Sequence, residues 1–444
     1  MDSPSYTHLN ATVRRFIEAK KKNSLVLCWA FVVGIVAGFV SIMFELLVKV
    51  VVQWKTLLAD AFGEPWLVSI VSSAVLVYVA IWLVRIFAPE AGGGGIHEIE
   101  GALDDLRPLR WKRVLPVKFV GSVFSLGSGL ALGPEGPAVQ MGGNLGQMIA
   151  EWFRVSKEEA HILIAAGAGA GLSAAFNAPL AGMLFVIEEM RPQFRYTFLS
   201  FQSVLIATAT ANIVALSFTG QVPILAMSML SAPPLLSLWL FLLCGTLFGL
   251  FGVTFNFLFI RTLDLFSGLH RQLGNGTGLF IGAFIGFLWW IFPDAVGEGD
   301  DVIRRAFQSS IPSNALLMLF VVRSGTTMLS AGFGAPGGLF APLLALGTLF
   351  GMWFGEVAHT WFPTLIASPI TFAVAGMCAL LSATVRTPLM SILLTVEITG
   401  NYTQILPLIV TCMTATLVAQ GLGGKPIYTV LLQRTLEQAN SQKA

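Results

Sequence analysis

Glu135 is the residue whose type and surroundings point most directly to chemistry. It stands in the run Gly-Pro-Glu-Gly-Pro at 133–137, amid uncharged sequence. An ionised carboxylate in a dry site costs several kcal/mol unless donors surround it, so a carboxylate in such a stretch is a functional candidate by default. Ionised Glu135 could occupy an anion site itself and leave that site when protonated. The alternative is a carboxylate that only caps its own helix.

Three glycine-rich segments, at residues 92–95, 133–137 and 337–342, each precede an apolar helical stretch. Glycine leaves backbone N–H groups open to a ligand, and the first N–H groups of a helix have no partner within it, so these ends suit an anion. None of the segments contains Lys or Arg, and the partial charges of helix ends, about +0.5 each, bind an anion gently enough for passage. The alternative is that these glycines only allow close helix packing.

Two further carboxylates, Glu188 and Glu189, end a long uncharged stretch just before Met190-Arg191. They are predicted to lie at a helix C-terminus, where negative charge is unfavourable unless a cation such as Arg191 or Arg195 compensates it. The residues themselves leave two alternatives open for this position, a proton relay or a solvated ion pair.

Evidence for an enzyme or a metal centre is weak. The run Gly297-Glu298-Gly299-Asp300 has the GxGD form of intramembrane aspartyl proteases, but it reads as a loop, and the partner Tyr-Asp dipeptide of those proteases is missing. The four cysteines and five histidines are dispersed without metal-ligand spacing, and the cysteines are predicted to be buried structural thiols. We therefore expect no enzymatic activity, no metal and no cofactor.

The elements that carry these residues are predicted to be membrane helices. Of 444 residues, 55% are hydrophobic and 11% charged, and residues 25–44 and 66–84 are charge-free runs of 20 and 19 residues. At about 1.5 Å per residue each run can cross a hydrocarbon core of roughly 30 Å. Basic residues precede the first run and follow the last, which predicts cytoplasmic termini. A net charge of +2 offers no basic patch for nucleic acid.

The apolar stretches after residue 110 are interrupted and repeat themselves. Gly129, Gly133, Pro137, Gly142 and Gly146 recur as Gly334, Gly338, Pro342, Gly347 and Gly351 at an offset of 205 residues, and residues 167–188 recur at 376–397 at an offset of 209. This pattern predicts two repeats of broken helices with the substrate at their interface. Glu188 recurs as Glu397, which favours a structural role, whereas Glu189 has no acidic counterpart.

The sequence resembles the CLC family of chloride channels and transporters, in particular its bacterial type. The motifs that carry the resemblance are Gly-Pro-Glu-Gly-Pro at 133–137, Ala-Phe-Asn-Ala-Pro-Leu-Ala-Gly at 175–182, Gly-Gly-Leu-Phe-Ala-Pro at 337–342 and Gly-Lys-Pro-Ile-Tyr at 424–428. The resemblance covers essentially the whole chain. It implies an all-α membrane protein with two inverted-topology repeats, and a homodimer in which each subunit has its own pore.

The resemblance also implies roles for single residues. Glu135 matches the external gate and proton acceptor, and Glu189 matches the internal proton-transfer glutamate that antiporters carry. Leu339 and Phe340 match positions whose backbone amides hold chloride, and Tyr428 matches the tyrosine whose hydroxyl helps to coordinate it. The implied activity is secondary active exchange of chloride for protons across a prokaryotic inner membrane. The alternatives are a passive gated anion channel and an antiporter for another small anion.

The sequence departs from the family at several positions. Gly94 stands where the family has a chloride-coordinating serine, which removes a hydroxyl donor from that binding position. His97 replaces a proline, either as a loop residue or as an added titratable group. Pro134 replaces a basic residue before the gate, so we expect weaker anion capture from outside. Only 16 residues follow Tyr428, too few for the regulatory domains of many eukaryotic members.

These observations predict four segments along the chain. Residues 1–24 are expected to form a cytoplasmic segment, residues 25–220 the first membrane repeat, residues 233–424 the second, and residues 425–444 a short cytoplasmic tail.

Overall fold

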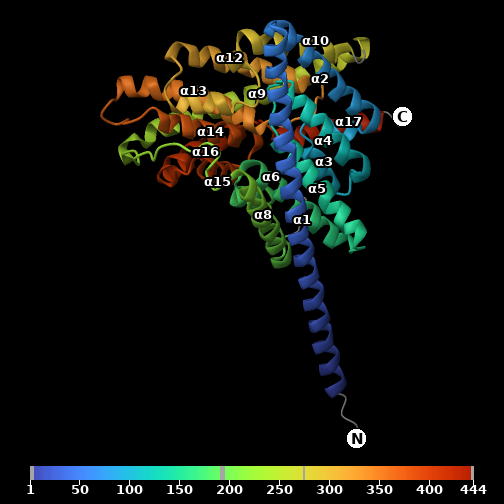
Figure 1. The fold of residues 1–444 in the computed structure, drawn as a ribbon. Coiled ribbons are helices and arrows are strands. Elements are labelled where there is room, and N and C mark those ends of the chain that lie inside the picture. Colours follow the sequence, from blue (N-terminus) through green and yellow to red (C-terminus); the bar gives the residue numbers. More distant parts are fainter. Residues whose placement is uncertain (1–4, 191–195, 274–275, 442–444) are drawn as a thin grey trace.

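The computed structural model describes residues 5–190, 196–273 and 276–441, and these are helical with connecting loops (Figure 1). The helices are α1 (Ser5–Phe62), α2 (Pro65–Phe87), α3 (Ile96–Leu103), α4 (Trp111–Gly127), α5 (Glu135–Trp152), α6 (Lys157–Phe176), α7 (Pro179–Glu188), α8 (Phe198–Thr219), α9 (Leu238–Leu273), α10 (Thr277–Ile291), α11 (Asp300–Phe307), α12 (Ser313–Gly332), α13 (Phe340–Trp361), α14 (Ile370–Val385), α15 (Pro388–Thr399), α16 (Ile405–Gly421) and α17 (Ile427–Ser441). Short 3-10 turns at Pro89–Ala91, Leu235–Ser237, Pro293–Ala295 and Tyr402–Gln404 connect some of them.

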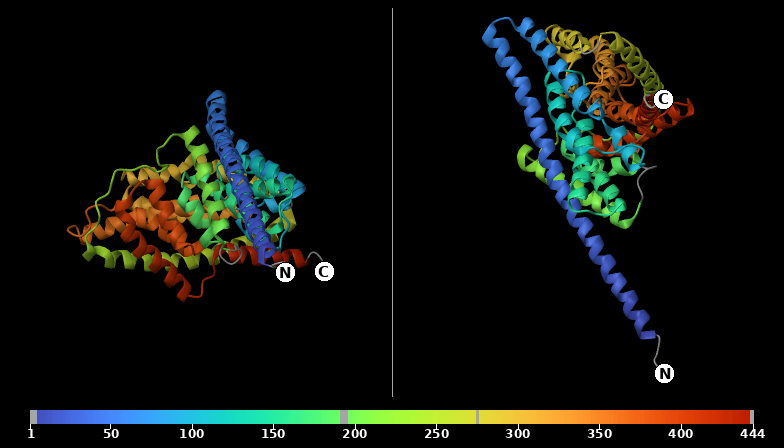
Figure 2. Two further views of the ribbon diagram at one scale, coloured as in Figure 1. Left: turned by 90° about the horizontal axis from the view of Figure 1, so that it is seen from below. Right: turned by 90° about the vertical axis from the view of Figure 1, so that its right-hand side faces the viewer.

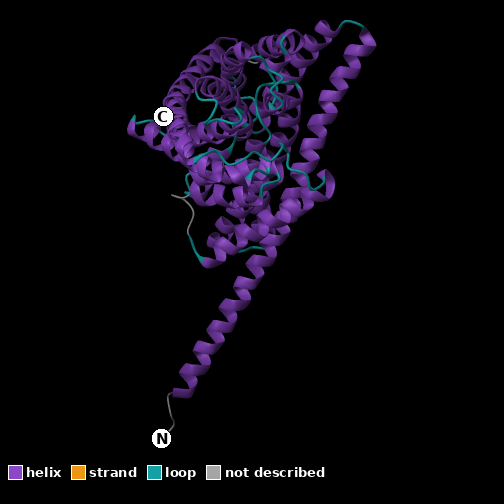
Figure 3. Ribbon diagram, turned by 90° about the vertical axis from the view of Figure 1, so that its left-hand side faces the viewer, coloured by secondary structure: helices purple, strands orange, loops and turns teal. Residues whose placement is uncertain are grey.

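Eight helices in the described part of the chain are long and apolar enough to cross a membrane. The two predicted spans, residues 25–44 and 66–84, lie within α1 and α2. Figures 2 and 3 show that α1 runs well beyond the helical body toward the N-terminus. Residues 5–24 therefore continue the first span as one helix, while residues 1–4 and the basic side chains before residue 23 lie outside the described part.

The predicted repeat appears as two series of eight helices, α1 to α8 and α9 to α16, which correspond in order. Helix α5 packs on α6 as α13 packs on α14, and α1 packs on α8 as α9 packs on α16. The same glycines make both close contacts: a Cβ atom on Gly142 would collide with the Gly167 carbonyl, and one on Gly347 with that of Gly376. Residues 220–234 join the two series, while the exact segment boundaries remain predictions.

The two repeats run in opposite directions and meet at a local two-fold axis. Gly133 and Gly338, which correspond in the repeat, donate backbone hydrogen bonds to each other at 2.9 and 2.7 Å as an antiparallel bridge. Glu188, at the end of α7, accepts the N–H of Met390 at 2.8 Å, and Glu397, near the end of α15, accepts that of Ala181 at 2.8 Å. Each carboxylate therefore caps the N-terminus of the opposite repeat's helix, which requires α7 and α15 to be antiparallel and gives the pair the predicted structural role.

The prediction of buried thiols is correct for three cysteines and wrong for one. Cys244, Cys378 and Cys412 are buried, whereas Cys28 is exposed. Cys28 lies on α1, and one side of a peripheral membrane helix faces lipid, so an apolar run does not by itself imply burial in protein.

Candidate ion-binding site

The three glycine-rich segments meet around Gly94, Gly136 and Gly338. Gly337 donates its N–H to the Gly93 carbonyl at 3.0 Å, and the Gly133–Gly338 bridge joins the other two segments. A Cβ atom on Gly136 would lie 2.9 Å from Gly338 Cα and 3.0 Å from Gly94 Cα. The close approach therefore requires glycine at Gly136. Helices α3, α5 and α13 begin just after these segments, as predicted, and their N-termini converge here.

Glu135 is the first residue of α5 and has no exposed surface. Its Oε1 atom accepts the N–H of Ala341 at 3.0 Å, and the backbone N–H groups of Phe340 and of Glu135 itself also bond to the carboxylate. Its Oε2 atom is buried without a hydrogen-bond partner. The carboxylate therefore occupies the N-terminus of α13, in the opposite repeat, and does more than cap its own helix.

Leu339, Phe340 and Tyr428 lie beside this carboxylate. Leu339 is the N-cap of α13 and Phe340 its first residue. The Phe340 ring packs between those of Tyr428 and Phe185, with centroid distances of 6.0 and 6.1 Å. The Tyr428 side chain is 1% exposed and its hydroxyl has no hydrogen-bond partner. A buried hydroxyl left without a partner costs free energy, so a bound ligand that accepts its hydrogen bond would be stabilised.

Glu189 is the C-cap of α7. Glu189 is partly buried, and its carboxyl group lies within hydrogen-bonding reach of that of Glu100 on α3. A hydrogen bond between two carboxyl groups requires a proton on one of them. Arg191 and Arg195, the cations considered as ion-pair partners, lie outside the described residues. The Tyr428 hydroxyl lies within electrostatic range of both Glu135 and Glu189.

Two of these neighbours were not identified from the sequence. Glu100 could have been noticed as a second acidic residue in the short apolar helix α3, but its nearness to Glu189 depends on tertiary packing. Lys118, buried on α4, donates to the carbonyls of Gly93 at 2.6 Å and Ala91 at 3.1 Å. These two bonds fix the segment that carries Gly94.

The structure also shows where the three residues that depart from the family motifs lie. At Gly94, a Cβ atom would lie 3.7 Å from the Gly337 carbonyl oxygen, an ordinary van der Waals distance. His97 lies in the first turn of α3, not in a loop, and its Nδ1 atom is buried without a partner. Pro134 is the N-cap of α5.

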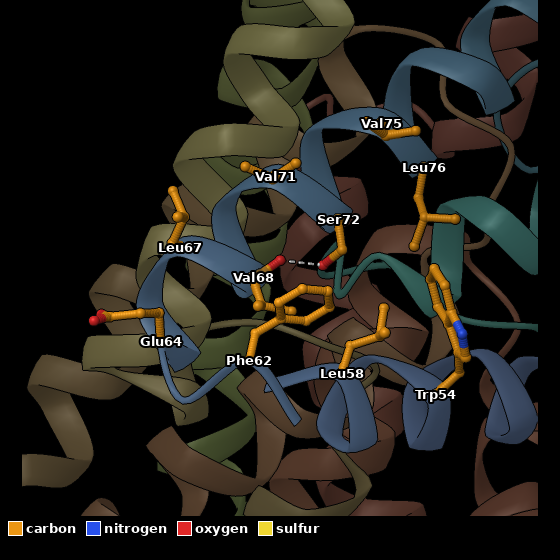
Figure 4. A pocket seen from close by; sticks show the side chains of 10 residues that line it. All are labelled: Trp54, Leu58, Phe62, Glu64, Leu67, Val68, Val71, Ser72, Val75 and Leu76. Carbon is orange, nitrogen blue, oxygen red and sulfur yellow. Dashed lines mark hydrogen bonds between the residues drawn. The ribbon is translucent and has the colours of Figure 1, made fainter. Parts of the chain in front are cut away.

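A hollow of about 440 Å³ lies elsewhere (Figure 4). It is bordered by Trp54, Leu58 and Phe62 of α1 and by Leu67 and Val71 of α2. Most of the lining is apolar, and Glu64, which also borders the hollow, is acidic, so the hollow offers an anion no favourable site. No group of His, Cys, Asp and Glu in the described part of the chain could hold a metal ion.

Comparison with known proteins places the chain among anion transporters. The sequence profile described as voltage gated chloride channel matches residues 76–420. The H(+)/Cl(-) exchange transporter ClcA of Vibrio cholerae is 49% identical over 439 residues, which cover 97% of this chain and 94% of the relative. The same transporter of Klebsiella pneumoniae is 49% identical over 442 residues, with coverage of 97% and 93%. The crystal structure of a slow cyanobacterial Cl⁻/H⁺ antiporter superposes with a TM-score of 0.91 at 43% identity, covering 94% of this chain and 99% of that one.

Proposed function

This chain belongs to the voltage-gated chloride channel family, CLC, and from that premise we propose that chloride and protons share one gate at Glu135. The protein is a multi-pass membrane protein that exchanges chloride for protons. The observation that supports the proposed mechanism is that the Glu135 carboxylate binds the N-terminus of α13. An anion bound to the same N–H groups must displace it.

Protonation of Glu135 is the step that opens the gate. The ionised carboxylate is held by charge-assisted hydrogen bonds from α13 and by the helix dipole. A proton removes the charge and weakens those bonds, so the neutral side chain leaves and chloride takes its place. Chloride is then held by the backbone N–H groups of Leu339 and Phe340 and by the Tyr428 hydroxyl, beside the segment that carries Gly94.

On the inner side, we assign the proton route to Glu189. A proton held between Glu189 and Glu100 can be exchanged with the solution because Glu189 is only partly buried. Chloride needs no carboxylate along its route, so the chloride and proton routes separate on the inner side of Tyr428. This division explains how the two fluxes are coupled without a shared inner path.

Transport of this kind requires no cofactor and no enzymatic step, and chloride is the bound substrate. We further propose a homodimer in a prokaryotic inner membrane, with cytoplasmic termini. The side chains of Leu180, Ile213, Leu389 and Leu417, on α7, α8, α15 and α16, are exposed and apolar, as an interface within the membrane would require.

The proposal is tested with purified protein in liposomes, where an opposed chloride gradient should drive protons uphill. Glu135→Gln mimics the protonated gate, so it should abolish proton transport and leave chloride flux largely independent of pH. Glu189→Gln should still conduct chloride but fail to move protons. Proton pumping retained in either variant would contradict that residue's role, and no pumping by the unmodified protein would favour a passive channel.

A further inference from the structure

Glu298 and Asp300 are acidic groups that the mechanism above does not use. They belong to the loop between the turn Pro293–Ala295 and α11. Gly297 donates its N–H to the Gly129 carbonyl at 2.9 Å, which fastens this loop to the segment leading to Glu135. The buried guanidinium of Arg323 donates to the carbonyls of Asp294 at 2.8 Å and Val296 at 2.9 Å. The loop is therefore fixed from two sides.

The loop lies about one helical turn from the gate. Gly299 packs against α13, where an added Cβ atom would be 2.6 Å from the Ala345 Cβ. Ala345 stands one turn, about 5.4 Å along the helix, after Ala341, whose N–H holds the Glu135 carboxylate. The charges of Glu298 and Asp300 each lie within electrostatic range of Glu135.

Exposure distinguishes these carboxylates from the gate. Glu298 and Asp300 are partly exposed, whereas Glu135 is fully buried. Glu135 Oε2 is buried with no partner, which leaves this atom able to accept a proton or a water molecule. A buried gate that is protonated from solution is served by a group that reaches both environments, and Glu298, partly exposed and within electrostatic range of Glu135, is such a group.

We propose that Glu298 transfers protons between the outer solution and Glu135. The inference rests on the proposed function of Glu135 and adds the residue that supplies its proton. In the forward step the O–H bond of protonated Glu298 breaks and its proton passes to a Glu135 oxygen, directly or through one water molecule. Glu298 then regains a proton from the outer solution, so charge and atoms balance and no electrons move.

The charged surroundings of Glu298 suit this task. Partial burial, followed by the negative charges of Asp300 and Glu135, raises the pKa of the Glu298 carboxyl well above its ordinary value. Glu45 and Lys49 of α1, which form an ion pair at 2.6 Å, and Arg323 of α12 also face it. A carboxyl group protonated nearer to neutral pH is a more effective proton donor there.

The test compares Glu298→Gln with Asp301→Asn, which removes the same charge from an exposed position in the same segment. Chloride-driven proton flux is measured in right-side-out and inside-out vesicles of expressing cells while the pH of the bathing solution is varied. In right-side-out vesicles, Glu298→Gln should slow proton flux about tenfold at neutral pH. The flux should recover as the bath is acidified. In inside-out vesicles, the proton flux of Glu298→Gln should depend on bath pH as that of the unmodified protein does. The proton flux of Asp301→Asn should equal that of the unmodified protein in both kinds of vesicle.

Two outcomes would overturn the assignment while leaving Glu135 as the gate: an unchanged response of Glu298→Gln to outer pH, or an equal loss in Asp301→Asn, which would indicate a general charge effect. Glu298→Asp, which keeps the carboxyl group, should restore most of the flux. Chloride flux retained by Glu298→Gln in acid would show that the variant is folded. Absence of pumping by the unmodified protein would contradict the proposed function as well.

Discussion

In the proposed mechanism, the carboxylate of Glu135 competes with the transported anion because both need the same donors. It lies on the N–H groups of Phe340 and Ala341, and no basic side chain was found in the glycine-rich segments. Partial charges on backbone groups hold a carboxylate firmly only while it is ionised. In that mechanism, a single proton is therefore sufficient to exchange one occupant of the site for another.

At the residue scale, the Tyr428 hydroxyl should contribute to chloride binding. Tyr428→Phe keeps the ring that packs on Phe340 but removes a donor whose oxygen has no partner in the protein. Calorimetric titration should show chloride affinity weakened by about 1 to 3 kcal/mol. Thermal stability without chloride should not fall, because no protein hydrogen bond is lost. Unchanged affinity would contradict the assignment.

The glycine that replaces the family serine gives a second test at this scale. Gly94→Ser adds a hydroxyl donor where there is room for its Cβ atom, so chloride should bind more tightly, by about 0.5 to 1.5 kcal/mol. Gly136→Ser is the matched control, since its Cβ atom would lie 2.9 Å from Gly338 Cα and force the segments apart. If both variants titrate alike, the Gly94 position does not face the ion.

At the element scale, paired glycines allow α5 to approach α6 and α13 to approach α14. Gly142→Ala places a methyl group against the Gly167 carbonyl and should cost about 1 to 3 kcal/mol. Gly325→Ala on α12 is the control: nothing lies within 4 Å of its Cβ position, so it should be neutral or stabilise the helix by about 1 kcal/mol. Thermal unfolding in detergent measures both. Equal stability of the two variants would mean that this contact does not limit the packing.

The reciprocal caps of Glu188 and Glu397 work at the same scale. Each carboxylate accepts two backbone N–H groups of the opposite repeat. Negative charge near a helix N-terminus is stabilised by the helix dipole. Two acidic residues that would be unfavourable at the C-termini of their own helices therefore link the two repeats. Glu189, one residue beyond Glu188, is left to pair with Glu100.

At the scale of the whole molecule, the residues proposed for the ion site lie on or next to α3, α5, α7, α13 and α17 of the same chain. A homodimer should therefore contain two independent pathways. When unmodified chains are mixed with Glu189→Gln chains before reconstitution, proton pumping should fall in direct proportion to the unmodified fraction. A steeper fall would indicate one pathway shared by both subunits, and a mass of one chain in detergent would contradict the dimer.

The sequence alone determined the membrane fold, the repeat and the identity of the main polar residues. A charge-free run that can span a bilayer, a glycine run before a helix and a constant offset between motifs are local or periodic properties, which a linear sequence contains. The roles of Glu135, Glu189, Gly94 and Tyr428 in transport remain predictions. The structure adds that all of them except Glu189 meet at or beside the helix N-termini.

Only the tertiary structure decided which residues act on each other. Glu135 binds a helix that begins about 200 residues later in the chain because the antiparallel Gly133–Gly338 bridge brings the two repeats together. The pairing of Glu189 with Glu100, the hold of Lys118 on the Gly93 carbonyl and the approach of the Glu298 loop to α13 arise in the same way. Contacts between distant segments depend on how several helices pack at once, and no spacing within one segment encodes that arrangement.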